Sequence, residues 1–206
     1  MKITDSDKIK NEKTLVVIKP DGVQRSIIGP IIKRFERIGL KLVAMKFFIP
    51  SAEMVERHYT VDPEWLRKRG EKNIEAYKLK NLIPPTNDPM ESGRDTLRRL
   101  SKYMKSGPNV AMIWQGAHAV GIVRKLIGGT EPLMSDVGTI RGDFVVDSYQ
   151  IAGIEDRAVR NIIHASGSAD EAEEEIKIWF EPDKILDYKL IQEEILYDIN
   201  LDGILE

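Results

Sequence analysis

The sequence predicts an α+β fold in which a four-stranded antiparallel sheet is covered by helices. Segments with the β-branched, apolar composition of buried strands alternate with segments whose apolar residues recur at helical spacing. The resulting order is strand, helix, strand, helical segment, strand, helix, loop, strand, helix. Its β-α-β-β-α-β core fits the split βαβ, ferredoxin-like arrangement. Strands are expected at 14–18, 40–48, 109–114 and 160–165, with a short one at 143–147.

The helices are expected from periodicity and from residues that start or stop a helix. Pro20 and the Asp21-Gly22 pair predict a turn after the first strand. Ser51 is placed to cap a short helix that ends near Tyr59. Ser168 and Glu171 have capping-box spacing before a helix whose apolar face faces the core. Helices are expected at about 27–38, 51–59, 96–104, 118–128 and 168–180.

The chain of 206 residues is expected to form a single domain over 1–206. Residues 60–95 hold four of the ten prolines and many charged side chains, which is typical of a helical and loop insertion packed on a domain. Within it a helix is expected at Trp65–Leu79. The C-terminal extension from about 183 to 206 is acidic with apolar patches, a composition that would let it wrap a neighbour.

Composition excludes several classes of protein. There is no cysteine, so disulfides, thiolate catalysis and cysteine-bound metals are ruled out. The net charge of −2 does not suit a general nucleic-acid-binding surface. The polar N-terminus lacks a signal-peptide core, and no apolar run approaches the roughly 20 residues of a membrane span. A cytoplasmic protein is expected.

The common phosphate-binding and nucleophile motifs are missing. The sequence contains neither G-x-x-x-x-G-K-[ST] nor G-x-G-x-x-G, and it has no H-R-D catalytic loop and no G-x-S-x-G elbow. The three histidines, at 58, 118 and 164, show no metal-ligand spacing. We therefore predict no metal site on the protein itself.

What remains is a set of polar residues at the ends of expected elements. Lysine, arginine, threonine and asparagine side chains together can clamp a polyphosphate without a glycine-rich cradle. Each also has an ordinary structural reading, because cations at element ends are commonly solvated and a single histidine at a strand end is more often structural. From the residues alone, the function stays open between a phosphate-binding enzyme and no catalytic role. The set is Lys19, Asp21, Arg124, Thr130, Arg141, Asn161, His164 and Ser166, with Glu175 on a helix shoulder from which it can reach His164.

At these residues the sequence resembles the nucleoside diphosphate kinases. The similar segments are "VVIKPDGVQRSIIGPIIKRFERIGLKLVAMK", "YMKSGPNVAMIWQG", "VRKLIGGTEP", "GTIRGDF" and "NIIHASGS…EIKIWF", in the order of the family. They cover about 10–60 and 96–188. The resemblance implies a ping-pong phosphotransferase in which a histidine carries the γ-phosphoryl group from a nucleoside triphosphate to a nucleoside diphosphate.

The resemblance also implies a role for each matching residue. His164 matches the phosphorylated histidine, with Glu175 and Ser166 orienting it, and Lys19 matches the lysine that contacts the transferred phosphate. The nucleotide-binding residues it implies are Lys19, Tyr59, Leu100, Arg124, Thr130, Arg141, Ala158 and Asn161. Among these, Asn161 bonds the sugar, and Leu100 and Ala158 contact the base.

Two positions depart from the family pattern. In the family, the base usually stacks on an aromatic residue near the start of the helix before "KYM". In this sequence that position is about Thr96, directly after the insertion. We expect Trp65 or Tyr77 to supply a substitute ring; without one, base affinity falls by about 1–3 kcal/mol. Gly167 stands where an aspartate is common, so contacts to metal or to neighbouring residues are expected to differ there.

The resemblance implies Mg²⁺ as cofactor, bound mainly through the nucleotide phosphates. It implies nucleoside di- and triphosphates as partners, and a homo-oligomer, a hexamer being favoured over a tetramer, with Pro132 in the interface loop. No membrane and no specific nucleic acid are expected as partners. Two alternatives are a non-catalytic nucleotide-sensing scaffold on the same fold and an RNA-binding sheet; near-neutral charge argues against the second.

Overall fold

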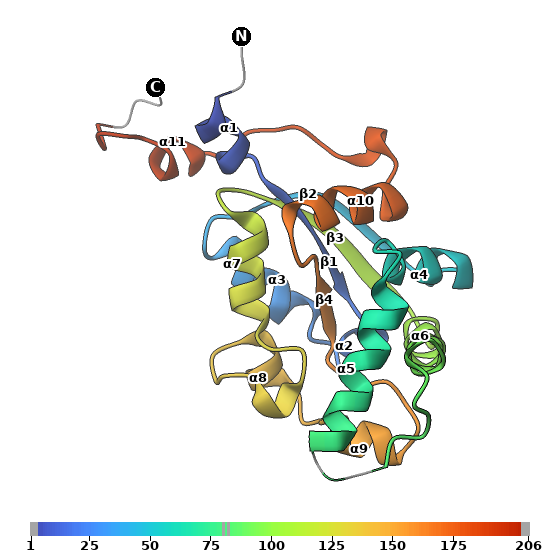
Figure 1. Cartoon of the computed structure of the whole chain (residues 1–206). Coiled ribbons are helices and arrows are strands. Elements are labelled where there is room, and N and C mark those ends of the chain that lie inside the picture. The colour runs from blue at the N-terminus through green and yellow to red at the C-terminus, as the bar shows by residue number, and fades with distance from the viewer. Residues whose placement is uncertain (1–3, 80, 82, 203–206) are drawn as a thin grey trace.

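The computed structural model describes residues 4–79, 81 and 83–202, and within them a four-stranded antiparallel sheet forms the centre of the fold (Figure 1). The strand order β2-β3-β1-β4 is that of the split βαβ arrangement, so the predicted fold class is confirmed. Antiparallel pairing joins β1 to β3 and β4, and β2 to β3. The strands are β1 (Lys13–Ile18), β2 (Lys41–Phe48), β3 (Asn109–Gln115) and β4 (Ile163–Ala165).

Helices lie on both faces of this sheet (Figure 1). One face is covered by α3, α7 and α8, and the other by α4, α6 and α10. The helix bounds are α1 (Asp5–Lys10), α2 (Pro20–Gln24), α3 (Ile28–Glu36), α4 (Ala52–Tyr59), α5 (Trp65–Leu79), α6 (Pro89–Met104), α7 (Ala119–Ile127), α8 (Ile140–Phe144), α9 (Tyr149–Ile154), α10 (Ala169–Trp179) and α11 (Glu193–Leu196), with 3-10 turns at Pro132–Met134 and Pro182–Lys184.

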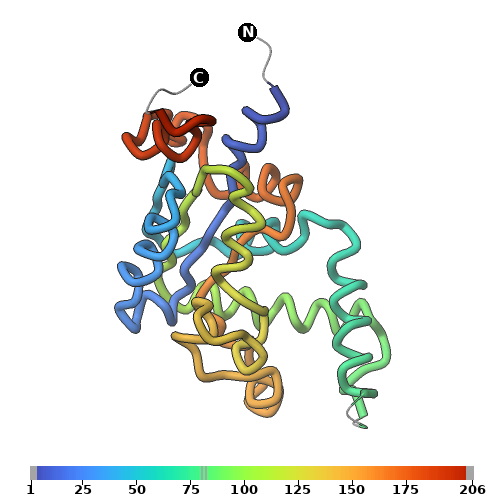
Figure 2. Tube along the Cα trace, turned by 90° about the vertical axis from the view of Figure 1, so that its left-hand side faces the viewer, coloured from blue at the N-terminus to red at the C-terminus, as the bar shows by residue number. Residues whose placement is uncertain are grey.

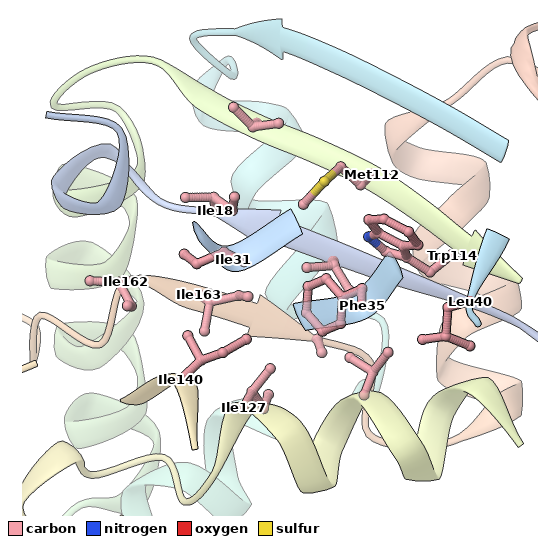
Figure 3. Close-up of a cluster of buried hydrophobic side chains, with 14 of the residues drawn as sticks. Ile18, Ile31, Phe35, Leu40, Met112, Trp114, Ile127, Ile140, Ile162 and Ile163 are labelled. Atoms are coloured by element: carbon pink, nitrogen blue, oxygen red, sulfur yellow. The ribbon is translucent and has the colours of Figure 1, made fainter. Parts of the chain in front are cut away.

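The sheet has two cores because successive side chains of a strand point to opposite faces. In β1, Val16 and Ile18 pack with Phe35 and Trp114 on the α3–α7 face, which Figure 3 shows in close-up. Leu15 and Val17 pack with Trp179 on the α10 face. All four β1 side chains are fully buried, so β1 reads as a continuous apolar run rather than an alternating one.

Two expected caps are present, and one differs in detail. Ser51 accepts a hydrogen bond from the Met54 amide at the start of α4, and Ser168 accepts one from the Glu171 amide at the start of α10. The Glu171 carboxylate does not close the capping box. It accepts from the Gly167 amide at 2.6 Å instead, one residue before the cap.

Three expectations about local structure are wrong. Residues 20–24 form the short helix α2 rather than a turn, because Pro20 suits the first position of a helix. Residues 143–147 form no strand, since α8 takes the first two of them. The expected strand at 160–165 is only three residues long. Ile162 has a φ of 51°, a left-handed value that strains a β-branched residue and stops pairing there.

The insertion forms a helical hairpin with the core. Its expected helix is present with the expected bounds, Trp65–Leu79, and it packs against α6, which begins at Pro89, earlier than expected. The two backbones nearly touch: a Cβ on Gly70 would lie 1.8 Å from the Pro89 carbonyl oxygen, and one on Gly93 would lie 2.0 Å from that of Leu66. Figure 2 shows this hairpin projecting beyond the sheet.

The C-terminal extension packs on its own chain at β2. The Leu186 amide donates to the Val43 carbonyl at 2.8 Å, and the Lys41 ammonium bonds both the Tyr188 carbonyl and Glu193, each at 2.8 Å. In Figure 2 the tail lies at the same end of the molecule as α1. Among the described helices, none is long and apolar enough to cross a bilayer.

Candidate active site

A cleft of about 1280 Å³ opens between the α5–α6 hairpin and the ends of α7, α8 and β4. It brings together residues that lie far apart in sequence. Of the polar and nucleotide-binding residues predicted from the sequence, two lie outside the lining: Ser166, which is fully buried, and Asp21, which is 7% exposed. The others line the cleft: Lys19, Tyr59, Leu100, Arg124, Thr130, Arg141, Ala158, Asn161, His164 and Glu175.

His164 stands in the middle of β4 and is placed there by strained backbone. Its Cα pairs with that of Val17 across β1 and β4. Just before the strand, the Ile163 amide donates to the Asn161 carbonyl at 2.6 Å, which makes a tight turn centred on Ile162. The Ile162 carbonyl accepts from the Lys19 amide at 2.7 Å. The strained turn therefore holds Asn161 and His164 next to the end of β1.

Glu175, buried on α10, lies against the His164 ring. Its Oε1 is 2.9 Å from His164 Nε2, close enough to bond that nitrogen, although it lies off the line of the ring N–H. Its Oε2 accepts a hydrogen bond from the Ser166 hydroxyl at 2.6 Å. Burial alone would raise the pKa of Glu175, but a positive charge on His164 and these hydrogen bonds hold it well below its usual range. The carboxylate is therefore ionised when it faces His164.

His58, which the sequence analysis did not assign to the site, completes this cluster. Its ring meets that of His164 edge to face, with centroids 4.4 Å apart, and its Nδ1 lies 3.4 Å from Glu175 Oε1. Trp179 Nε1 donates to the same Nδ1 at 3.2 Å. Burial lowers the pKa of His58 to about 3, so its ring is neutral. No local signal marks His58, because 106 residues separate it from His164 and 117 from Glu175.

His58, His164 and Glu175 also offer three atoms within 4.8 Å of one another, a spacing that permits a metal ion. The fold thus brings two of the three histidines together although their sequence spacing gives no sign of it. An indole N–H only donates, so the Trp179 bond occupies the His58 lone pair that a metal would need. The cluster is accounted for as a hydrogen-bonded support for His164.

Lys19 directly follows β1, at the N-cap of α2, and is 4% exposed. Its ammonium donates to Asn161 Oδ1 at 2.7 Å and lies over the Tyr103 ring, while the Tyr103 hydroxyl donates to Asp21. Burial and the positive charge of Arg141 lower the pKa of Lys19 to about 7, with Asp21 opposing them. Two of its three N–H groups have no hydrogen-bond acceptor among the described residues, so they are available for an anion.

Arg141 is held by main-chain carbonyls rather than by carboxylates. Its guanidinium donates to the carbonyls of residues 128, 129, 161 and 163, at 2.6–3.3 Å. Four of its five N–H groups are therefore used, and burial lowers its pKa to about 10. It can offer a ligand one N–H and a fixed positive charge.

Arg124 and Thr130 are the exposed members of the same wall. Arg124 lies in the last turn of α7 and has no ion pair among the described residues. The Thr130 main-chain carbonyl accepts a hydrogen bond from Asn161 Nδ2 at 3.0 Å. The Thr130 hydroxyl has no hydrogen-bond partner among the described residues and can bond a ligand. Tyr59 lies opposite, with its hydroxyl buried and without a hydrogen-bond partner in the described ranges.

The far end of the cleft is built by α6 and by the C-terminal parts of α5 and α9, where Tyr77 approaches Gly153. Leu100 and Ala158 face it, and Thr96 is tied to α5, since its hydroxyl accepts from Asn73 Nδ2 at 2.8 Å. Of the two rings expected to replace the missing aromatic, Trp65 packs on Tyr59, with centroids 5.6 Å apart. Tyr77 lines the cleft beside α9.

The carboxylate of Glu171 lies next to Gly167, the second position that departs from the family pattern. A Cβ on Gly167 would lie 2.3 Å from Glu171 Oε2, which already accepts from the Gly167 amide. Glu171 also lines the cleft. A carboxylate therefore stands beside this position, contributed by α10 instead of by residue 167 itself.

Comparison with known proteins agrees with this geometry. The sequence matches the family "Nucleoside diphosphate kinase" over residues 12–65 and 89–185, leaving out most of α5. It is 48% identical over 180 residues to a nucleoside diphosphate kinase of Pyrobaculum aerophilum, covering 85% of this chain and 98% of the relative.

Solved structures show the same likeness. The crystal structure of an NDP kinase from Pyrobaculum aerophilum superposes with a TM-score of 0.83 at 47% identity, covering 86% of this chain and all of that one. A Borrelia burgdorferi nucleoside diphosphate kinase, described as a transition-state mimic with vanadate and ADP, gives 0.73 at 33% identity, covering 89% and 95%. Because the family model matches most of the chain and a relative is 48% identical over 180 residues, this chain belongs to the nucleoside diphosphate kinase family.

Proposed function

We propose that this nucleoside diphosphate kinase carries the phosphoryl group on Nδ1 of His164. The observation that supports this choice is the 2.9 Å approach of Glu175 to His164 Nε2. A carboxylate on Nε2 favours the tautomer with its proton there, which leaves the lone pair on Nδ1. The same carboxylate stabilises the positive charge that the ring acquires when Nδ1 forms a bond to phosphorus.

Each half-reaction is one displacement at phosphorus. The Nδ1 lone pair attacks the γ-phosphorus, the bond from that phosphorus to the β,γ-bridging oxygen breaks, and the nucleoside diphosphate leaves with that electron pair. A second diphosphate then attacks the phosphohistidine with a β-phosphate oxygen, and the electron pair of the N–P bond returns to Nδ1. One site thus serves both directions, which accounts for ping-pong kinetics.

Cations in the cleft lower the barrier by meeting charge on the phosphoryl oxygens. We assign this role to Lys19, whose free N–H groups lie at the His164 end, and to Arg124, whose guanidinium is unpaired. Arg141 acts chiefly as a fixed charge, because main-chain carbonyls take four of its N–H groups. Thr130 adds a hydroxyl. Losing one such donor costs roughly 10²–10³ in rate.

The sugar and base are assigned to the rest of the cleft. Asn161, fixed between Lys19 and the Thr130 carbonyl, is placed to bond sugar hydroxyls, and Tyr59 packs at the His164 end. Leu100 and Ala158 take the two faces of the base. Of the candidate substitute rings, Tyr77 is the better placed to stack, since Trp65 already packs on Tyr59. These contacts are common to all nucleotides, so low base selectivity is expected.

Mg²⁺ is assigned to the nucleotide rather than to a cage of side chains. This ion prefers oxygen ligands and usually combines substrate phosphates and water with one or two carboxylates. Glu171 supplies such a carboxylate on the cleft wall beside Gly167, so the residues present fit the ion. When bound, Mg²⁺ neutralises charge on the phosphates.

We also propose a homo-oligomer, with a hexamer favoured over a tetramer. Residues 128–142, the loop that contains Pro132, present Leu133, Met134 and Val137 at 70%, 74% and 93% exposure. Apolar side chains gathered on one loop are typical of an interface. Sedimentation of the purified protein tests this, and a monomer at micromolar concentration would contradict it.

The phosphohistidine is tested by intact mass. The protein is incubated with ATP and Mg²⁺, freed of nucleotide, and weighed before and after addition of GDP. We expect a gain of one phosphoryl group that GDP removes, and no gain in His164→Asn. His118→Asn is the control, because His118 is exposed at the start of α7 in a left-handed conformation that asparagine tolerates. ATP binding without any mass gain would instead support the non-catalytic scaffold.

A further inference from the structure

The cleft-facing side of α5 is a stripe of residues four apart. Trp65, Arg69, Asn73 and Tyr77 all line the cleft, as expected for side chains that share one helix face. All but Trp65 lie in the segment that the family match leaves out. Whatever this stripe contributes to ligand binding is therefore particular to chains with such a helix.

The basic residues of α5 divide into paired and unpaired groups. On the outer side, Arg67 bonds Glu64 and, at 3.1 Å, Glu71, and Lys68 bonds Asp62 at 2.7 Å. Arg69 follows them directly in sequence but faces the cleft, where it is half-buried. No ion pair or hydrogen bond joins the Arg69 guanidinium to any other residue that the structure describes. All five of its N–H groups are thus available within the cleft.

Two aromatic rings locate Arg69 along the cleft. Its guanidinium carbon is 5.6 Å from the centre of the Tyr149 ring, and the Tyr149 amide donates to Glu131, the residue after Thr130. One turn before Arg69, Trp65 packs on Tyr59 near His164. Burial and Glu175 raise the pKa of Tyr59, and the positive charges of Arg141 and Arg69 oppose that rise. Arg69 therefore faces the phosphate end of the cleft, not the base end.

We propose that Arg69 binds the phosphates of the nucleoside triphosphate, as an anion-binding group that α5 adds to the cleft. A half-buried guanidinium without a carboxylate partner among the described residues is suited to bidentate phosphate contacts, and its cation–π contact with Tyr149 favours its position in the cleft. Lys72 also borders the cleft, but it is exposed and makes no such ring contact. The inference rests on the proposed nucleotide site, which it extends by one cation.

The test compares Arg69→Met with Arg67→Met, its matched control on the outer face. Dissociation constants are measured by calorimetry for tripolyphosphate, ADP and AMP, and kcat/KM is measured for ATP. We expect Arg69→Met to weaken tripolyphosphate binding and kcat/KM for ATP by about tenfold. The affinity for ADP should fall less, and the affinity for AMP should hardly change. Arg67→Met should leave all four values unchanged, and Arg69→Lys should recover part of the tripolyphosphate affinity.

Several results would overturn the proposal. Equal losses for AMP and ATP would mean that Arg69 shapes the cleft and does not meet phosphates, as would a failure of Arg69→Lys to recover affinity. Equal behaviour of the two methionine variants would also reject it. Failure of the wild-type protein to bind tripolyphosphate or to take up a phosphoryl group is a different result, since it rejects the nucleotide site itself. Tyr149→Leu separates stacking from charge: it keeps Arg69 and should cost less than Arg69→Met.

Discussion

Trp179 Nε1 donates a hydrogen bond to His58 Nδ1 at 3.2 Å. Because an indole N–H cannot accept, this contact assigns the lone pair of His58 to Nδ1 and its proton to Nε2. The neutral ring therefore has no proton to offer Glu175 Oε1, which lies 3.4 Å from the same nitrogen. Glu175 Oε1 is therefore left to His164, while Oε2 accepts from the Ser166 hydroxyl.

Trp179→Phe should release His58 from this tautomer. Its proton could then move to Nδ1 and bond Glu175 Oε1 in competition with His164. We expect phosphohistidine formation to slow by about tenfold, the equivalent of one hydrogen bond of about 1.4 kcal/mol. Rapid-quench measurement of a single turnover checks this. Phe48→Leu is the control, since Phe48 packs on Trp179 at 5.7 Å without touching its N–H; an equal slowing there would show that packing alone is responsible.

Lys19 should impose a pH dependence on ATP binding. Because burial and Arg141 lower its pKa to about 7, the free enzyme loses this positive charge as the pH rises through neutrality. The kcat/KM profile, which reports the free enzyme, should then fall above pH 7 in the wild type relative to Lys19→Arg, whose guanidinium keeps its proton. Parallel profiles of the two proteins between pH 6 and 9 would contradict the assignment.

The lowered pKa of Lys19 should also make the stability of the protein depend on pH. Between about pH 7 and the ordinary lysine pKa of 10.5, the unfolded chain binds a proton at residue 19 that the folded chain has lost. The free energy of unfolding therefore rises with pH across this window. Lys19→Met removes the effect, and at pH 7 it should be neutral or stabilising by about 1–4 kcal/mol. Urea unfolding at pH 7 and 9 measures both; a wild type that gains no stability relative to Lys19→Met would rule it out.

Gly70 and Gly93 should be indispensable to the hairpin that carries Arg69. A methyl group at either position would enter the backbone of the facing helix, and backbone cannot yield as a side chain tip can. We expect Gly70→Ala and Gly93→Ala to destabilise the protein by about 1–3 kcal/mol and to raise KM for ATP. Gly121→Ala on α7 meets nothing within 4 Å and should stabilise by about 0.5–1 kcal/mol. Thermal unfolding of the three variants decides the point.

Local pattern predicts much of the fold and little of the contacts within the site. The apolar run of β1, the Ser51 cap and the helix at Trp65–Leu79 all depend on neighbours in sequence, and all are present. The length of β4 does not follow from its apolar composition, because Ile162 has a left-handed φ within the tight turn that the Ile163 amide and the Asn161 carbonyl close.

His58 and Arg69 escape sequence reasoning for a related reason. Each is an ordinary polar residue on a helix. The role of His58 depends on His164 and Glu175, which tertiary packing brings to it, and the role inferred for Arg69 depends on the absence of a carboxylate partner among the described residues. Asn161 and His164 were singled out by position, yet their roles followed only from a family resemblance. A hydrogen bond between residues 142 positions apart, such as that between Lys19 and Asn161, cannot be predicted from the spacing of residues in the sequence.

The carboxylate beside residue 167 provides a last test, because it combines stability with metal dependence. Gly167→Asp would bring a second negative charge against Glu171 and displace the acceptor of the Gly167 amide. We expect a loss of about 1 kcal/mol in the free energy of unfolding. Replacing Glu171 by serine in the same chain should remove the repulsion, so the two substitutions together should cost less than the sum of each alone.

Metal dependence then separates the two roles of Glu171. Glu171→Gln keeps the shape of the side chain but removes its charge, so it should raise the Mg²⁺ concentration needed for half-maximal phosphohistidine formation by a few fold. Gly167→Asp combined with Glu171→Ser restores one carboxylate to the same wall and should return that concentration toward the wild-type value. An unchanged Mg²⁺ midpoint in Glu171→Gln would confine Glu171 to holding the Gly167 amide, and would leave the ion entirely to the nucleotide phosphates and water.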